Sequence, residues 1–340
     1  GSAQLGAVSV ETDAGITGNA FLGSSHLGAN HLAGPLIDYL KPVVMGNDPQ
    51  DIGRLWPRLW KMNRQAPIAA IGAIDICLWD INGKVSGQPI HRLLGTCKDS
   101  VPAYSSTAYH KMSAGYIEEA LRFKDMGWKA HKIHPYGEPR MDIDLCRAVR
   151  EAVGDEHILM LDSMWAYQYE DAMRVGRAIE DLNYYWYEDP LAEQDLYNYI
   201  KLRNLLEIPI LATEYAPGGF LGYAPWIFQQ ATDFLRGDVA VKGGITACIK
   251  AAHLAEGFGM NFEIHHGGNS LNNVANLHIS AAIANCEFFE VLLPDGAQKY
   301  GLVEDIVVDA DGMVHVPMEP GLGAKIDFEL ITAKTLQILT

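Results

Sequence analysis

The sequence predicts an α/β protein in which parallel strands close into a barrel. Downstream of Val101, apolar runs typical of strands alternate with helical patterns, and such alternation indicates a parallel sheet. Three of the strands end in an acidic residue, Asp162, Glu188 and Glu214, and successive acids are 26 residues apart (188 − 162 and 214 − 188). One strand, one helix and two short loops need about that length. The number of units favours a closed barrel over an open doubly wound sheet, for which a GxGxxG motif is expected and not found.

The N-terminal part of the chain, residues 1–97, predicts a separate α+β domain. Residues 7–18 alternate between apolar and polar side chains and then turn, which is typical of a β-hairpin. Helical patterns follow at 31–40, 51–60 and 66–86. The last of these is rich in Ala and Ile and carries few charges, so we expect a buried helix there.

The expected barrel takes up residues 98–294. Its strands are predicted at 101–105, 128–134, 157–162, 184–188, 208–214, 234–241, 261–265 and 288–291. The intervening helices are predicted at 114–126, 141–153, 169–182, 196–206, 223–230, 246–258 and 272–284. Beyond the barrel the periodicity breaks. The tail, 295–340, contains short apolar segments that could form strands and rejoin the N-terminal domain (304–308, 314–316 and 325–329).

The composition excludes several classes of protein. The 340 residues are 49% hydrophobic and 20% charged, which is typical of a globular protein. A formal net charge of −16 argues against a nucleic-acid partner. No apolar run approaches the ~18 residues of a membrane-spanning helix, so we expect no membrane partner. The five cysteines are scattered without a CxxC pair, which predicts neither a zinc site nor disulfides and favours a cytoplasmic location.

The three evenly spaced acids predict a cation site. Neighbouring parallel strands end at the same edge of a sheet, so Asp162, Glu188 and Glu214 should lie close together. Three carboxylates at that density repel one another unless a cation lies between them, and oxygen-only ligands suit Mg²⁺. A single acid at a strand end is more often a helix N-cap or a salt-bridge partner, but three in register favour a metal site.

Other strand ends carry residue types that serve acid–base chemistry. The active site of a βα barrel lies at the carboxyl ends of its strands, and these ends add Lys132, His134, Asp238, His265, His266 and Glu290. Because side chains alternate along a strand, Lys132 and His134 should share one face. The adjacent His265 and His266 should point to opposite sides, so only one of them should face the barrel.

A series of short motifs carries a resemblance to a known family. In order they are 73–80 (Ala-Ile-Asp-Ile-Cys-Leu-Trp-Asp), 127–134 (Gly-Trp-Lys-Ala-His-Lys-Ile-His), 161–162 (Leu-Asp), 188–190 (Glu-Asp-Pro), 212–214 (Ala-Thr-Glu), 238–246 (Asp-Val-Ala-Val-Lys-Gly-Gly-Ile-Thr) and 320–323 (Pro-Gly-Leu-Gly). Through them nearly the whole chain resembles the enolase superfamily and, within it, the mandelate racemase-like subgroup. The resemblance implies a modified TIM barrel, (β/α)7β, with an α+β capping domain built from the N-terminal segment and the C-terminal tail.

The resemblance also implies a cofactor and a type of chemistry. Asp162, Glu188 and Glu214 would be Mg²⁺ ligands. In the family the metal binds a substrate carboxylate and stabilises the enediolate that forms when the α-proton is removed. A proton α to a carboxylate is very weakly acidic, so its removal needs a positioned base and strong electrostatic stabilisation.

Further roles follow from the same resemblance. Asp238 lies shortly before a Gly-Gly pair, where the subgroup keeps an aspartate that hydrogen-bonds a histidine on the next strand. The spacing to the following helix favours His265 as that histidine, whereas the pattern before the next Gly-Gly pair favours His266, and we choose His266. Glu290 lies where the family places an acid that hydrogen-bonds the substrate carboxylate.

The second strand departs from the subgroup. It ends in Lys132, Ile133 and His134, where the subgroup usually has Lys-x-Lys. The second lysine would normally be the base for one enantiomeric face of the substrate. His134 could replace it as a base or an acid, or it could contact substrate hydroxyls, so a simple racemase is not the expected activity.

The sequence therefore predicts a Mg²⁺-dependent lyase that acts on a small-molecule carboxylate, most simply a sugar-acid dehydratase. The α-proton would be removed and the β-hydroxyl lost, giving a 2-keto-3-deoxy acid. A polar mouth rich in histidine suits a polyhydroxylated substrate (His134, His265, His266, Asn269 and Asn272). The alternatives are an isomerase, either a racemase, an epimerase or a cycloisomerase, and, in another class, a barrel that binds a sugar acid without turnover. We also expect a homo-oligomer.

Overall fold

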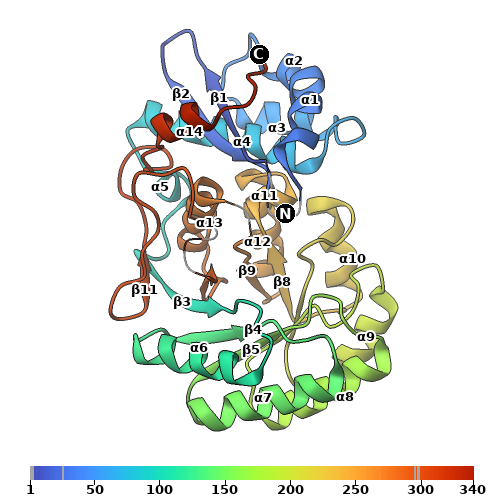
Figure 1. Ribbon diagram of the computed structural model, residues 1–340. Coiled ribbons are helices and arrows are strands. Elements are labelled where there is room, and N and C mark those ends of the chain that lie inside the picture. Colours follow the sequence, from blue (N-terminus) through green and yellow to red (C-terminus); the bar gives the residue numbers. More distant parts are fainter. Residues whose placement is uncertain (1–3, 25–26, 268, 295, 297–298) are drawn as a thin grey trace.

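The protein consists of a barrel of parallel strands with a capping domain at one end (Figure 1). The computed structural model describes residues 4–24, 27–267, 269–294, 296 and 299–340. The predicted fold class is confirmed: the parallel sheet closes on itself, and the N-terminal segment forms an α+β cap with a small antiparallel sheet. Residue 295, at which we place the start of the tail, lies outside the described residues.

The cap begins with the hairpin that the alternating N-terminal pattern predicts. Strands β1 (Gly6–Glu11) and β2 (Thr17–Leu22) pair antiparallel. The helices that follow are η1 (Ala29–His31), α1 (Ala33–Pro35), η2 (Leu36–Leu40), α2 (Lys41–Val44), α3 (Ile52–Trp60), α4 (Ile68–Ser86) and α5 (Ile90–Leu94). Most of α4 is buried, as its composition predicts, and Gly87 ends it in the left-handed conformation that glycine adopts without strain.

The barrel alternates strands and helices. Its strands are β3 (Ser100–Ser106), β4 (Ala130–Ile133), β5 (Ile158–Asp162), β6 (Tyr187–Glu188), β7 (Ile210–Ala212), β8 (Phe234–Gly237), β9 (Asn261–Ile264) and β10 (Phe289–Leu292). The helices are α6 (Ser113–Asp125), α7 (Pro139–Val153), α8 (Tyr169–Asp181), α9 (Leu196–Leu205), η3 (Gly219–Gly222), α10 (Tyr223–Phe228), α11 (Val239–Lys242), α12 (Ile245–Gly257) and α13 (Ser270–Ala282). Each strand pairs in parallel with the next, and β10 also pairs with β3, which closes the ring.

Three segments differ from the predicted elements, and one of them is the strand predicted at 304–308, of which only Val308 forms an isolated bridge, to Val314. The strand predicted at 234–241 ends at Gly237, because the Asp238 carboxylate accepts the N–H of Ala240 and begins the short helix α11 instead. In the tail, β11 (Met313–His315) pairs antiparallel with β3 of the barrel, and the segment predicted as a strand at 325–329 runs into helix α14 (Phe328–Lys334). The carboxyl terminus lies beside the cap (Figure 1).

The inside of the barrel is filled in two layers that follow from strand alternation. The lower layer is apolar and aromatic (Tyr104, Ala130, Met160, Trp186, Leu211 and Phe288). Two residues further along four of these strands, the inward positions are charged (Lys132, Asp162, Glu188 and Glu290). Residues two apart on a strand share a face, so an apolar base supports a charged layer at the carboxyl ends of the strands.

The cap is joined to the barrel beside the ends of β8 and β9. Trp56 of α3 donates its indole N–H to the carbonyl of Gly243 (3.0 Å). The N–H and hydroxyl of Thr246 donate to the buried Asp75 carboxylate of α4 (2.8 and 2.6 Å). Gly244 has φ +93°, and a Cβ there would lie 2.3 Å from Asp75, so this contact requires glycine. Among the described residues, no helix is both long and apolar enough to cross a membrane.

Candidate active site

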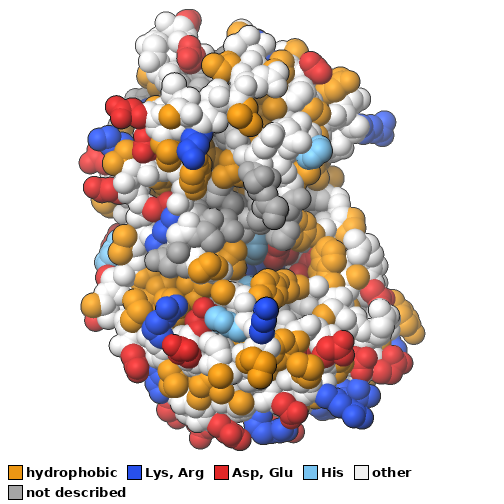
Figure 2. All heavy atoms as spheres, viewed as in Figure 1, with side chains coloured by type: hydrophobic (Ala, Val, Ile, Leu, Met, Phe, Trp, Pro, Cys, Tyr) orange, Lys and Arg blue, Asp and Glu red, His pale blue; other side chains and the backbone are white. Residues whose placement is uncertain are grey.

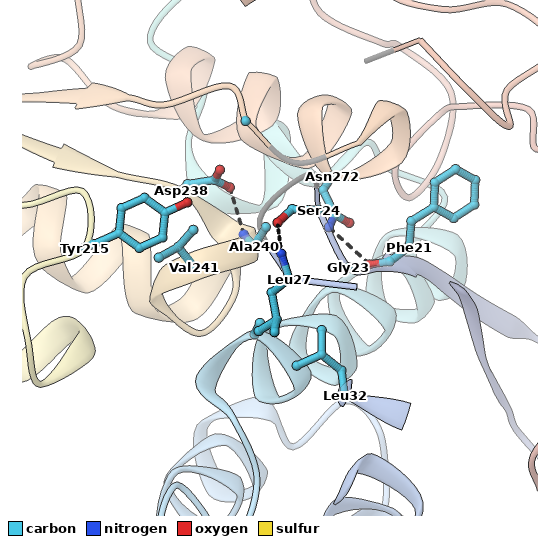
Figure 3. A pocket seen from close by; sticks show the side chains of 12 residues that line it. Phe21, Gly23, Ser24, Leu27, Leu32, Tyr215, Asp238, Ala240, Val241 and Asn272 are labelled. Atoms are coloured by element: carbon cyan, nitrogen blue, oxygen red, sulfur yellow. Dashed lines mark hydrogen bonds between the residues drawn. The ribbon is translucent and has the colours of Figure 1, made fainter. Parts of the chain in front are cut away.

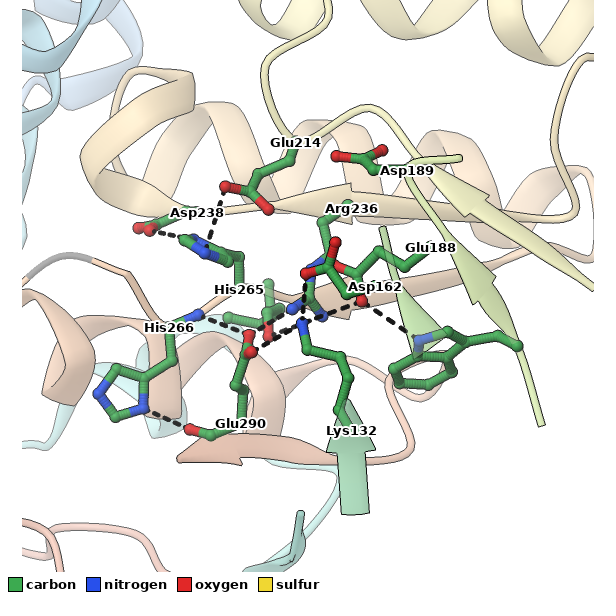
Figure 4. Close-up of polar contacts among 12 residues, drawn as sticks. Lys132, Asp162, Glu188, Asp189, Glu214, Arg236, Asp238, His265, His266 and Glu290 are labelled. Atoms are coloured by element: carbon green, nitrogen blue, oxygen red, sulfur yellow. Dashed lines mark hydrogen bonds and ion pairs between the residues drawn. The ribbon is translucent and has the colours of Figure 1, made fainter. Parts of the chain in front are cut away.

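The predicted site residues meet at the carboxyl ends of the barrel strands (Figure 4). Lys132 lies at the end of β4, Asp162 and Glu188 end β5 and β6, and Glu290 lies on β10. Glu214 follows β7, Asp238 follows β8, and His265 and His266 follow β9. Figure 2 shows acidic and histidine side chains inside the hollow between the cap and the barrel.

Lys132 is the centre of the charged layer. Its Nζ lies 3.1 Å from Asp162 Oδ2, 3.0 Å from Glu188 Oε2 and 2.8 Å from Glu290 Oε1. The side chain is completely buried. Burial alone would lower the pKa of Lys132, but the charges of Glu188 and Glu290 hold that pKa well above its usual value. Lys132 is therefore a fixed cation beneath the mouth of the barrel.

Arg236 on β8 is a second buried cation that the sequence reasoning missed. Its Nε lies 2.9 Å from Glu188 Oε1, and its Nη2 contacts both Glu290 and the hydroxyl of Tyr104. Burial alone would raise the pKa of Glu290, but Arg236 and Lys132 hold it well below its usual value. An arginine within the short run Phe-Leu-Arg-Gly, two positions before Asp238, was the signal that could have found it.

His134 lies on the β4 side of the mouth with both ring nitrogens close to acceptors. Nδ1 is 2.9 Å from the carbonyl of Thr107, and Nε2 is 3.1 Å from Asp162 Oδ2. The ring of Tyr109 stacks on it, with 5.9 Å between centroids. Burial would lower the pKa of His134, but the hydrogen bond and charge of Asp162 raise it above its usual value. This arrangement suits a protonated imidazole.

His265 lies on the other side of the mouth and is paired with Asp238. Its Nδ1 is 2.9 Å from Asp238 Oδ2, and its Nε2 is 3.2 Å from Glu214 Oε1. Asp238 also accepts a hydrogen bond from Asn276 Nδ2 (3.0 Å), which fixes the carboxylate. Burial would lower the pKa of His265, but Glu214 and Asp238 raise it to about 9.

The choice of His266 as the partner of Asp238 is wrong. The His266 ring points away from Asp238 (Figure 4), its Nδ1 contacts the carbonyl of Glu290, and its ring packs against Phe289. Burial lowers the pKa of His266. The correction has a simple cause: adjacent residues of an extended chain point to opposite sides, and β9 presents His265 to the mouth.

The three acids on β5, β6 and β7 have the chemistry of a Mg²⁺ donor set. They are carboxylates on adjacent strands, and hard oxygen ligands of this kind suit the ion. In the structure, however, Asp162 and Glu188 contact Lys132, and Glu214 contacts His265. Within the described part of the chain, no group of three or more His, Cys, Asp or Glu side chains is arranged to hold a metal ion. The donors fit Mg²⁺ by type and by their positions on adjacent strands, whereas in this structure their carboxylates contact Lys132 and His265.

A small cavity of about 20 Å³ lies between the cap and the barrel, next to Asp238 (Figure 3). Its walls come from the cap (Phe21, Gly23, Ser24, Leu27, Leu32 and Ala69) and from loops of the barrel (Tyr215, Asp238, Ala240, Val241, Gly267 and Asn272). Asn272 Nδ2 donates to the carbonyl of Phe21 (3.1 Å), and Asn269 Nδ2 donates to that of Gly23 (2.9 Å). The cap segment that closes this side is thus held by the start of α13.

The barrel, the cap and the ring of acids and histidines at the strand ends define an enzyme of the enolase type. Residues 115–330 match the enolase C-terminal domain-like family, and residues 1–95 match the N-terminal domain of mandelate racemase / muconate lactonizing enzyme. The chain therefore belongs to the mandelate racemase / muconate lactonizing enzyme family of the enolase superfamily, and the predicted family is confirmed.

The relatives include enzymes with named activities. The chain is 30% identical to an arabinonate dehydratase of Saccharolobus solfataricus, with 84% of this chain and 78% of that protein covered. It is 31% identical to an L-talarate/galactarate dehydratase of Salmonella typhimurium, with 82% and 70% covered. A D-glucarate dehydratase from Agrobacterium tumefaciens, solved as a complex with magnesium, is similar in structure: the TM-score is 0.86, the identity 34%, and 98% of this chain and 91% of that chain are covered.

Proposed function

We propose that the protein is a Mg²⁺-dependent sugar-acid dehydratase. The reaction would remove the proton α to the substrate carboxylate and release the β-hydroxyl as water, giving a 2-keto-3-deoxy acid. The observation that carries this proposal is the placement of His134 and His265 on two sides of one mouth, with carboxylates between them. The relatives that are named as dehydratases of arabinonate and of talarate or galactarate support the substrate class.

Asp162, Glu188 and Glu214 are the residues that would hold Mg²⁺. When bound, the ion supplies positive charge that neutralises the substrate carboxylate and stabilises the negative charge that develops on it. Lys132 adds a second, fixed positive charge at the same place, because Glu290 and Glu188 keep it protonated. Buried, preorganised charges of this kind stabilise a transition state without reorganisation during the reaction.

His265 is the group we assign as the base. Asp238 accepts a hydrogen bond from Nδ1–H, so Nε2 is the nitrogen that faces the mouth and takes the α-proton. The same carboxylate stabilises the imidazolium that forms. Such a positioned base typically contributes a factor of about 10²–10⁴ to the rate.

His134 is the group we assign as the acid. The carbonyl of Thr107 holds its Nδ1 proton, so Nε2–H is the donor that faces the mouth. That proton would join the leaving β-hydroxyl as the Cβ–O bond breaks, and water departs. The enol that remains loses its hydroxyl proton and takes up a proton at Cβ, which gives the keto acid. His265 takes up one proton in the reaction and His134 gives one up. Each cycle therefore starts with His265 neutral and His134 protonated.

The structure also gives a reason to keep a second function, epimerisation of a sugar acid. Two ionisable imidazoles lie on two sides of one mouth, and one could remove the α-proton while the other returns a proton to the opposite face. No water would be lost in that reaction. The mass of the product separates the two functions directly.

The test is a panel of sugar acids incubated with the purified protein and Mg²⁺. We expect formation of a 2-keto-3-deoxy acid. Its mass should be lower than that of the substrate by about 18 mass units, the mass of one water. An α-proton exchanged for deuterium in D₂O without loss of water would instead support the epimerase. A protein that binds a sugar acid but neither exchanges its α-proton nor dehydrates it would contradict both enzyme functions.

A further inference from the structure

The segment that carries Glu214 leaves strand β7 in a strained conformation. Thr213 has φ +90°, a region that β-branched residues rarely adopt because it is sterically strained. Strain of this kind persists only where the surrounding structure fixes the backbone. The contacts of residues 213–216 therefore show what orients the Glu214 carboxylate.

Three side chains, those of Thr213, Glu193 and Lys242, fix this segment at residues 213, 215 and 216. The hydroxyl of Thr213 donates to the carbonyl of Arg236 (3.2 Å) and accepts the Arg236 N–H (2.9 Å), which ties it to β8. The carboxylate of Glu193 accepts the N–H of Tyr215 (2.6 Å). The ammonium of Lys242 donates to the carbonyl of Ala216 (3.3 Å). The residues on either side of Glu214 are thus held by hydrogen bonds.

Glu193 is an unusual residue to find in this position. It lies in the loop between β6 and α9 and is only 2% exposed. Burial of a carboxylate is costly. Burial and the nearby charge of Glu214 raise the pKa of Glu193 to about 7, although the charge of Lys242 opposes this shift. A neutral residue would avoid that cost, but the Glu193 carboxylate accepts the N–H of Tyr215, next to Glu214.

We propose that Glu193 is a positioning residue that holds residues 213–216 so that the Glu214 carboxylate faces the mouth of the barrel. The inference rests on the proposed function, in which Glu214 is a Mg²⁺ ligand. Glu193 would touch neither the ion nor the substrate and would act through the backbone of Tyr215. Loss of its oxygen would let the strained turn at Thr213 relax and move the carboxylate away.

The other end of the same strand offers a matched control. Glu180 on α8 accepts the N–H of Ile208 (2.9 Å), just before β7 begins, as Glu193 accepts the N–H of Tyr215 just after it ends. Both are glutamates that accept a hydrogen bond from a backbone N–H close to one end of β7. Only Glu193 lies at the end of β7 that carries Glu214. The two glutamates therefore make the same kind of contact but should differ in their effect on the affinity for Mg²⁺.

The experiment is calorimetric titration of Mg²⁺ into the substrate-free protein, with folding checked by circular dichroism and Tm. We expect Glu193→Ala to weaken Mg²⁺ binding by about tenfold or more, and Glu193→Asp to do the same because its shorter side chain cannot reach Tyr215. Glu193→Gln keeps an acceptor oxygen and should bind Mg²⁺ within about threefold of the parent. Glu180→Ala should lower Tm but leave the affinity for Mg²⁺ within about threefold.

Three outcomes would overturn the inference. Equal Mg²⁺ affinity of Glu193→Ala and the parent would show a purely structural role. Equal weakening in Glu193→Gln and Glu193→Ala, with Glu193→Asp unaffected, would show that the charge matters and the hydrogen bond does not. A tenfold loss in Glu180→Ala would show a general effect of loosening β7. If the parent itself binds no Mg²⁺, the proposed function fails, and that result is distinct from the other three.

Discussion

The two sides of the mouth hold their histidines in different ways. On the β4 side, the Nδ1 of His134 faces a neutral backbone carbonyl, that of Thr107. On the side of β8 and β9, the Nδ1 of His265 faces the carboxylate of Asp238. The Nε2 atoms are alike, since each faces an acid at the end of another strand: Asp162 on the adjacent β5, and Glu214 after β7, which is two strands from β9.

The difference lies in what stabilises the proton on each ring. A carboxylate behind a histidine stabilises the imidazolium more than a carbonyl does, because it adds a full negative charge. Both histidines have a raised pKa, and that of His265 reaches about 9. The Asp238 carboxylate thus favours the imidazolium of His265, whereas the Thr107 carbonyl brings no such charge to the Nδ1 of His134. This difference supports our proposal that His265 is the base and His134 the acid.

The largest expected effect comes from His265→Asn. If His265 is the base, α-proton exchange and dehydration should both fall by about 10³- to 10⁴-fold, because no other group takes that proton. The measurements are kcat for keto-acid formation and the rate of deuterium incorporation at the α-carbon. Mg²⁺ binding should be retained, which shows that the site is still assembled.

His266→Asn is the matched control for that variant. The two histidines are adjacent, and the side chain of His265 is 12% exposed while His266 is buried, but the His266 ring contacts the backbone of Glu290 and not Asp238. We expect a loss of less than about tenfold in kcat, with the main effect on Tm. A greater loss in His266→Asn than in His265→Asn would reverse the assignment of the base.

The next effect in size is that of His134→Gln, which removes the proposed acid. Dehydration should slow by about 10²-fold, because water would have to leave without a proton from Nε2. The α-proton exchange catalysed by His265 should be nearly unchanged. If exchange falls as far as dehydration does, His134 takes part in proton removal, and the division of labour between the two sides is wrong.

Sequence patterns could predict which strands form the site but not how each side chain is used. The even spacing of Asp162, Glu188 and Glu214 predicts adjacent strand ends, because it reflects the length of one barrel unit. The choice between His265 and His266 depends on a single residue of register, which an apolar run does not fix. Arg236 was missed because its partners lie on strands far away in the chain, and only the closed barrel brings them together.

A smaller effect is expected for Asp238→Asn. Loss of the carboxylate should reduce the plateau value of kcat/KM, which is reached at pH values where the base is neutral, by roughly tenfold, since the imidazolium of His265 loses its stabilising charge. The base must be neutral to act, so the rate should fall on the acidic side of the pH–rate profile. Because Asp238 raises the pKa of His265, this acidic limb should lie at lower pH in the variant. The pH–rate profile of kcat/KM tests this. An unchanged limb would mean that His265 does not titrate in that profile.

The smallest expected effect on catalysis is that of Asp75→Asn, which tests how the His265 side is attached to the cap. Burial raises the pKa of Asp75 to about 7 against the hydrogen bonds from Thr246 that would lower it. The folded protein thus keeps a proton that the unfolded chain loses above its ordinary pKa near 4. The contribution of Asp75 to stability is therefore full below about pH 4 and is lost as the pH rises to about 7.

Urea unfolding at pH 5 and pH 8 measures that contribution. The free energy of unfolding of the parent should be lower at pH 8 than at pH 5. This fall should exceed that of Asp75→Asn by on the order of a few kcal/mol, because the variant has no proton to lose at this position. Equal changes in the two proteins would show that Asp75 ionises normally in the folded state. Thr246, which donates to Asp75, follows Asp238 closely in the chain. Ionisation of Asp75 should therefore loosen the cap first on the His265 side, so the two sides of the mouth should differ in stability as well as in chemistry.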